Sequence, residues 1–194
     1  MPILNLRRHI KLLPFLIAAF VIAWIKGYKP FVIFRSFIIY PFLALEIVFW
    51  VFQYLSAKGN LDVIRYAGIL KTGFFLYLIL PVFYFKLYRS AIFGCGLVLV
   101  GTLLNKLVMN ANGGKMPVKF TFSNLTGFSN EATFSAPGAI HIGMSEQTKM
   151  NFLGDIFDFG YCVMSIGDII MKAYFVIVFY NMIVLLNNRY CGGK

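Results

Sequence analysis

The sequence has few charged side chains, and very few of them are acidic. Charged residues make up 13% of the 194 positions, and only 7 are Asp or Glu, whereas charged residues make up roughly 25% of soluble domains. Hydrophobic residues reach 60%, and the mean hydropathy is +0.78. A water-soluble fold would have too little polar surface to cover so much apolar content. The composition therefore predicts an integral membrane protein, and the length fits one polytopic domain over residues 1–194.

The motifs of familiar enzyme and metal-site classes are also missing from the sequence. The chain contains no HExxH, no GxSxG, and neither a Walker-type nor a dinucleotide-type glycine loop. Its three cysteines, Cys95, Cys162 and Cys191, show no CxxC or zinc-like spacing. These absences leave the cofactor unassigned and no metal site expected, and they favour a protein that is not an enzyme.

The net charge of +11 does not predict a nucleic-acid partner, because the basic residues do not cluster on one element. They fall mostly beside apolar runs, as Arg7, Arg8, Lys11, Lys26, Lys29, Lys86, Arg89 and Arg189. This is the flanking pattern of membrane spans that meet anionic lipid headgroups. The expected partners are the lipid bilayer and, beyond it, another membrane protein.

Five apolar runs approach the roughly 17–25 residues that span a bilayer. They cover residues 12–25, 34–55, 66–85, 90–109 and 166–186. They predict an all-α integral membrane fold, a five-helix transmembrane bundle, in which Pro41 kinks the second helix. A bias toward Phe, Ile, Lys and Asn is typical of AT-rich bacterial genomes, so the expected location is the bacterial cytoplasmic membrane.

One connection in this bundle is long, residues 110–165, and we expect it to be partly ordered and to cap one end. Within it, residues 120–123 alternate in a way that is compatible with a strand. Lys and Arg number nine on the amino-terminal side of the bundle and seven on the other. This difference favours an amino terminus inside the cell.

The fourth run carries a stripe of small residues. Ala91, Gly94 and Gly101 fall near one another on a helical wheel, and Asn105 continues the stripe. Small residues let membrane helices approach closely, and an Asn can hydrogen-bond across the contact. We expect this face to pack against another helix of the bundle.

Asn112, Gly113, Gly114 and Lys115 follow the same run. Paired glycines permit the left-handed turn that ends a helix. The exposed backbone beside Lys115 would alternatively form an anion-binding nest. These four residues are therefore candidate ligand-binding residues as well as a helix end.

The fifth run opens with Ser165 and Asp168 in a Ser-x-x-Asp arrangement. Such a pair satisfies first-turn backbone N–H groups, and an acid there also suits the helix dipole. Helix capping is the first interpretation of Asp168, and ligand binding is the second.

Glu46 lies near the middle of the second run, where a carboxylate is costly and normally faces the bundle interior. Lys71 and Lys172 are its candidate partners. The residue is either part of a buried structural ion pair or the centre of an ion or proton pathway.

His141 lies in the long connection, and the only other histidine, His9, belongs to the basic amino terminus. A histidine beside a carboxylate can act as a general base or a ligand, and Asp155 and Asp158 are available carboxylates. A lone histidine is also commonly a hydrogen-bonded structural residue. His141 and Asp155 are the candidate catalytic residues.

Together these motifs resemble an uncharacterised bacterial membrane family, domain of unknown function 5317. The shared pattern is a helix with an Asn, an Asn-Gly-Gly-x-Met-Pro-Val segment, one histidine, Leu-Gly-Asp, and Ser-Ile-Gly-Asp before the last helix. Here it comprises Asn105, Asn112 to Val118, His141, Leu153 to Asp155, and Ser165 to Asp168. The resemblance implies that these motifs belong to one site, and it supplies no reaction.

The sequence thus predicts a multi-pass membrane protein of unknown activity that binds a small ligand, a lipid or a partner through a polar site at one end of the bundle. The alternatives are a membrane-embedded enzyme that uses His141 and Asp155, and an ion or solute pathway centred on Glu46. The absence of an internal repeat counts against a secondary transporter of the usual kind.

Overall fold

Helices dominate the protein, as the apolar runs predict. The computed structural model describes residues 12–57, 66–119, 121–122, 140–159 and 163–192. The α-helices in these ranges are α1 (Leu13–Ile25), α2 (Ile39–Ala57), α3 (Ala67–Tyr77), α4 (Ile79–Tyr84), α5 (Tyr88–Ala111) and α7 (Ile166–Tyr190). Two short 3-10 helices, η2 (Pro30–Arg35) and η5 (Asn151–Leu153), accompany them.

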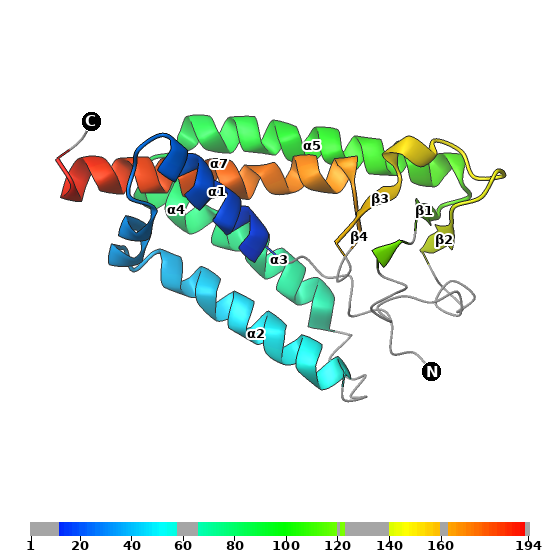
Figure 1. Cartoon of the computed structure of the whole chain (residues 1–194), viewed down its shortest axis with the longest axis horizontal. Coiled ribbons are helices and arrows are strands. Elements are labelled where there is room, and N and C mark those ends of the chain that lie inside the picture. Colours follow the sequence, from blue (N-terminus) through cyan, green and yellow to red (C-terminus); the bar gives the residue numbers. More distant parts are fainter. Residues whose placement is uncertain (1–11, 58–65, 120, 123–139, 160–162, 193–194) are drawn as a thin grey trace.

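The two longest helices, α5 and α7, lie side by side and antiparallel, as Figure 1 shows. They contain 24 and 25 residues, and in the described part of the chain they alone are long and apolar enough to cross a membrane. The apolar stretches of α1, α2 and α3–α4 are shorter, at 10–17 residues. Helix length therefore supports two spans, and the five-helix transmembrane arrangement is not established by it.

Prolines shorten two of the predicted spans. Pro81 lacks the N–H that would bond the carbonyl of Tyr77, where α3 ends, so the third run divides into α3 and α4. Pro41 lies in the first turn of α2, where an N–H has no partner within the helix. It therefore marks the start of α2 instead of the kink that the sequence predicts.

The long connection contains a four-stranded sheet, so the prediction of an all-α fold is wrong at this end of the molecule. The strands are β1 (Met116–Val118), β2 (His141–Gly143), β3 (Asp155–Asp158) and β4 (Val163–Ser165), in the order β2-β1-β3-β4. β1 runs parallel to β2 and β3, and β3 runs antiparallel to β4. The sheet lies beside the last turns of α5 and beyond the amino end of α7 (Figure 1).

The strand predicted at residues 120–123 is not part of this sheet. Phe120 and Ser123 lie outside the described residues, as do His9 and Cys162, while Thr121 and Phe122 are not in a strand.

The hydrophobic core is centred on α7. Its rings pack against the other helices: Phe179 lies 4.8 Å from Phe42 of α2, and Phe175 lies 5.5 Å from Phe75 of α3, measured between ring centroids. The fully buried α7 side chains are Phe175, Val178, Phe179, Met182 and Ile183. This packing holds α7 in place, and the amino end of α7 in turn positions the polar residues near the sheet.

Candidate functional site

His141 and Asp155 come together on the sheet. They are the first residues of β2 and β3, the two strands that flank β1. In the register, His141 pairs with Met116 and Asp155 with Val118. The His141 Nε2 and Asp155 Oδ2 atoms lie 3.5 Å apart, and the two side chains are 16% and 9% exposed. The strand register thus produces an imidazole–carboxylate pair that is largely buried, with the imidazole the more exposed of the two.

The other candidate carboxylate, Asp158, has a different role. Its Oδ2 atom accepts hydrogen bonds from the Thr121 N–H at 3.0 Å and from the Thr121 hydroxyl at 3.2 Å. The sequence leaves both Asp155 and Asp158 open as partners of His141, and the geometry assigns the pair to Asp155.

A second polar group joins α5 to the start of α7. The Asn105 amide donates to Asp168 Oδ1 at 3.0 Å, and the Ser165 hydroxyl donates to Asn105 Oδ1 at 2.8 Å. The Asp168 N–H donates to Ser165 Oγ at 3.0 Å, which confirms the predicted helix cap. These bonds close a ring of three residues, which we call the Asn105 ring. The part that sequence reasoning missed is the bond from Ser165 to Asn105.

The two polar groups are neighbours through the β3–β4 ladder. Asp155 is the register partner of Ser165, so the His141–Asp155 pair and the Asn105 ring meet at one strand position. Four predicted site residues, Asn105, His141, Asp155 and Asp168, therefore lie at the same end of the α5–α7 pair.

Glycines allow this close arrangement. A Cβ atom on Gly101 would lie 2.4 Å from the Gly167 carbonyl oxygen, and one on Gly167 would lie 2.2 Å from Asn105 Oδ1. A Cβ on Gly154, next to Asp155, would lie 2.7 Å from the Pro117 carbonyl oxygen. The small-residue stripe of α5 thus packs against α7 as predicted, with the ring of Tyr174 covering Gly94.

Asn112, Gly113 and Gly114 end α5. The Gly114 N–H donates to the Met109 carbonyl at 2.8 Å, and both glycines have positive φ, 63° and 83°. This is the Schellman arrangement that closes a helix. The exposed Lys115 follows it and directly precedes Met116, the register partner of His141.

The Asn112 side chain holds a second segment in place. Its Oδ1 accepts from the Lys149 N–H at 2.8 Å, and its Nδ2 donates to the Lys149 carbonyl at 2.8 Å. These bonds tie the segment before β3 to the carboxyl end of α5. Asn112 therefore holds in place the segment that leads into η5 and β3.

Glu46 is buried at 4% exposure and accepts the Leu12 N–H at 3.1 Å. Leu12 is the N-cap of α1, so the carboxylate satisfies a first-turn donor at the positive end of that helix. Of the predicted partners, Lys172 places its Nζ atom 2.9 Å from Met164 Sδ, and the side chain of Lys71 lies outside the described part of the chain.

Among the described residues, no group of three or more His, Cys, Asp or Glu side chains is arranged to hold a metal ion. The His141–Asp155 pair offers two such donors. An imidazole nitrogen and a carboxylate in this arrangement can form hydrogen bonds and exchange protons.

Comparison with known proteins finds one match, to a family model. No curated protein and no solved structure matches the chain. A model described as a family of unknown function (DUF5317) matches residues 30–180, which include every member of the His141–Asp155 pair and of the Asn105 ring. The chain belongs to this family of unknown function, DUF5317, as its motifs predict.

Proposed function

We propose that this chain is a multi-pass protein of the bacterial cell membrane that binds a small polar ligand at its sheet end. Two helices have the length and apolar composition of membrane spans. The order of the elements also supports several crossings, because the turn after α1, the turn between α4 and α5, and the carboxyl terminus lie at one end of the molecule while the sheet lies at the other (Figure 1).

The observation that carries the binding proposal is the His141–Asp155 pair. A carboxylate only 9% exposed beside an imidazole presents both an acceptor and a titratable donor to a ligand that carries hydroxyl or amino groups. The Asn105 ring next to it is closed by three hydrogen bonds, which give the pair an ordered support. Small-ligand sites commonly use a small number of such placed polar groups to fix the orientation of the ligand.

The test is a thermal-stability screen of the detergent-purified full chain with sugars, amino acids, polyamines and phosphorylated metabolites. We expect at least one class to raise the melting temperature of the wild-type chain and to have no effect on His141→Asn or Asp155→Asn. The control is Asp158→Asn, which removes a carboxylate from the same strand and should respond as the wild type does. Equal ligand responses in all four proteins would refute the proposal.

Catalysis by the same pair is a second candidate function. Asp155 lies 3.5 Å from Nε2 of His141, which is the arrangement of a histidine base oriented by a carboxylate. Nδ1 is then the atom left to accept a proton from a substrate. Conversion of the bound ligand to a new product, lost in His141→Asn, would favour an enzyme, and recovery of the ligand unchanged would favour a binding protein.

An ion or solute pathway centred on Glu46 has less support. Its Oε1 atom accepts the Leu12 N–H, which gives this buried acid a structural role at the start of α1.

A further inference from the structure

The end of the molecule opposite the sheet is basic. Three segments meet there: residues 26–36 after α1, residues 84–90 around the turn between α4 and α5, and residues 185–191 at the end of α7. They contain no Asp or Glu and six cations, which are Lys26, Lys29, Arg35, Lys86, Arg89 and Arg189. Short basic loops beside membrane helices attract the phosphates of anionic lipids.

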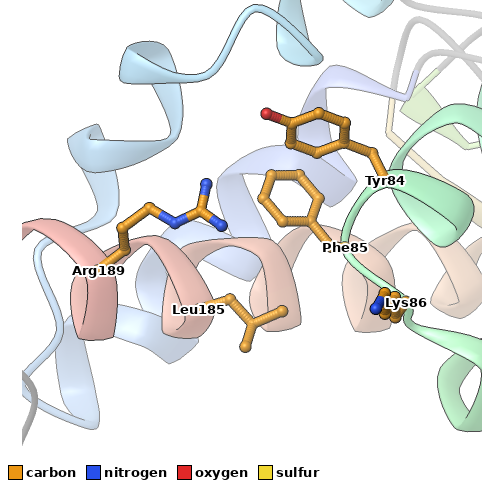
Figure 2. A pocket seen from close by; sticks show the side chains of 5 residues that line it. All are labelled: Tyr84, Phe85, Lys86, Leu185 and Arg189. Atoms are coloured by element: carbon orange, nitrogen blue, oxygen red, sulfur yellow. The ribbon is translucent and has the colours of Figure 1, made fainter.

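A cavity of about 320 Å³ opens within this basic end. It lies between the turn that joins α4 to α5 and the last turns of α7, and its lining combines two cations with two aromatic rings and one aliphatic side chain: Tyr84, Phe85, Lys86, Leu185 and Arg189. Figure 2 shows the Arg189 guanidinium reaching from α7 toward Phe85, with Lys86 at the opposite edge. The volume is at the small end of the roughly 300–1,000 Å³ of ligand pockets, so it suits a headgroup.

The two cations of this cavity have no acidic partner among the described residues. In the part of the chain that the structure describes, neither Lys86 nor Arg189 forms an ion pair. Lys86 also has a φ of 54°, a left-handed conformation that is uncommon for residues other than glycine. The helix dipole explains a cation at Arg189, which lies in the last turn of α7. It does not explain a cation at Lys86, which lies in the turn between α4 and α5. The turn thus presents a second cation across the cavity from the first.

An apolar groove approaches the same cavity along the helices. It lies between α2 and the α3–α4 segment and is lined on its two sides by Pro41 and Leu80, among others. Leu80 is four residues before Tyr84 on α4, about one helical turn or 6 Å away. Tyr84 in turn packs on Phe37, with ring centroids 5.2 Å apart. A charged cavity and an apolar groove at this spacing match the two parts of a phospholipid.

We propose that the cavity between Lys86 and Arg189 binds the phosphate-bearing headgroup of an anionic phospholipid, whose acyl chain lies along the adjacent apolar groove. This site is separate from the His141–Asp155 pair, and it holds whether or not that pair binds a ligand. Lys86 and Arg189 contact the phosphate, and the tyrosine hydroxyl of Tyr84 is the neutral donor beside them.

The test is a titration of the detergent-solubilised full chain with phosphatidylglycerol, followed by native mass spectrometry. We expect saturable binding of phosphatidylglycerol and much weaker binding of phosphatidylcholine. Lys86→Asn and Arg189→Gln should each weaken phosphatidylglycerol binding about fivefold and together about twenty-five-fold. Asn is chosen at position 86 because it tolerates positive φ. Arg189→Lys keeps the charge and should retain most of the affinity.

The matched control is the double variant Lys29→Gln and Arg89→Gln, which removes two exposed cations of the same end that do not line the cavity. An equal loss of affinity in this control would overturn the site and leave only general charge attraction. Unchanged binding in the Lys86 and Arg189 double variant would also overturn it. Competition by millimolar inorganic phosphate that abolishes lipid binding would reassign the cavity to a soluble phosphate, against the lipid proposal.

Discussion

Gly101 and Gly167 set the distance between α5 and α7. A methyl group on Gly101 would lie 2.4 Å from the carbonyl oxygen of Gly167, a backbone atom that cannot rotate away. Gly101→Ala is therefore expected to destabilise the protein by about 1–3 kcal/mol through overpacking. Unfolding in mixed detergent micelles with increasing dodecyl sulfate, followed by circular dichroism, measures this change.

Gly96 of the same helix provides the control for that substitution. A Cβ atom there would meet nothing within 4 Å, so Gly96→Ala should be neutral or stabilising by up to about 1 kcal/mol. Equal effects at the two positions would show that the contact between α5 and α7 is not the cause.

Asn105 forms hydrogen bonds with both other members of the Asn105 ring, Ser165 and Asp168. Asn105→Ala removes the amide that bonds Asp168 and the oxygen that accepts from Ser165, and leaves both groups half-satisfied. We expect a loss of about 1–3 kcal/mol in the same unfolding assay. Asn110→Ala, at an exposed position of α5, should change stability by less than about 0.5 kcal/mol. A similar cost at both positions would contradict the role given to Asn105.

At this scale the sequence predicts local bonds better than distant ones. Ser165 and Asp168 are three residues apart, and their cap is visible in the chain itself. The contact between His141 and Asp155 depends on the strand register across β1, which no local pattern displays. One partner of Glu46 is the backbone N–H of Leu12, and no pattern of charged side chains in the sequence points to a bond of this kind.

Among the elements, α1 depends on a neighbouring helix for its first turn. Its N-cap, Leu12, has no side-chain oxygen to accept a first-turn N–H, and Glu46 of α2 supplies one. In Glu46→Leu, the Leu12 amide hydrogen should exchange with solvent at least about tenfold faster, because a bond to a charged acceptor contributes about 1.5–3 kcal/mol. Hydrogen–deuterium exchange with mass spectrometry measures this rate.

Glu46→Gln retains a carbonyl oxygen and should show a smaller increase than Glu46→Leu. If Glu46→Leu left the exchange of the first turn of α1 unchanged, Glu46 would have no role as a cap. An ion or solute pathway would then be the better explanation of this buried acid.

The sequence predicts the positions of long elements better than those of short ones. The runs at residues 90–109 and 166–186 correspond to α5 and α7, whose ends extend the prediction by only a few residues. Strands such as Met116–Val118 contain three residues, too few to show an alternating pattern. β1 also pairs with strands that come more than twenty residues later. Local sequence patterns therefore do not predict the sheet.

For the whole molecule, the proposed topology determines which end faces outward. With the amino terminus inside and five crossings, Cys191 at the end of α7 lies outside the cell, and the exposed Lys149 of the sheet end lies inside. In cells that carry Cys95→Ser and Cys162→Ser, a membrane-impermeant maleimide should label Cys191 without permeabilisation. After the further changes Cys191→Ser and Lys149→Cys, labelling should require permeabilised cells.

The reverse pattern of labelling would show that the molecule has the opposite orientation. Labelling of both positions from the same side would show that α7 does not cross the membrane, and the topology of five crossings would be wrong.

The central place of α7 has a consequence for how the chain is made. Synthesis begins at the amino end, so α1 emerges first and α7 last, yet α1 packs mainly on α7. β4 also leads directly into α7, so the sheet and the core are completed by the same late segment. A nascent chain must therefore hold its first helix without its principal neighbour through most of translation. A ribosome that stops before Ile166 releases a product that lacks α7, the helix on which both α1 and α5 pack.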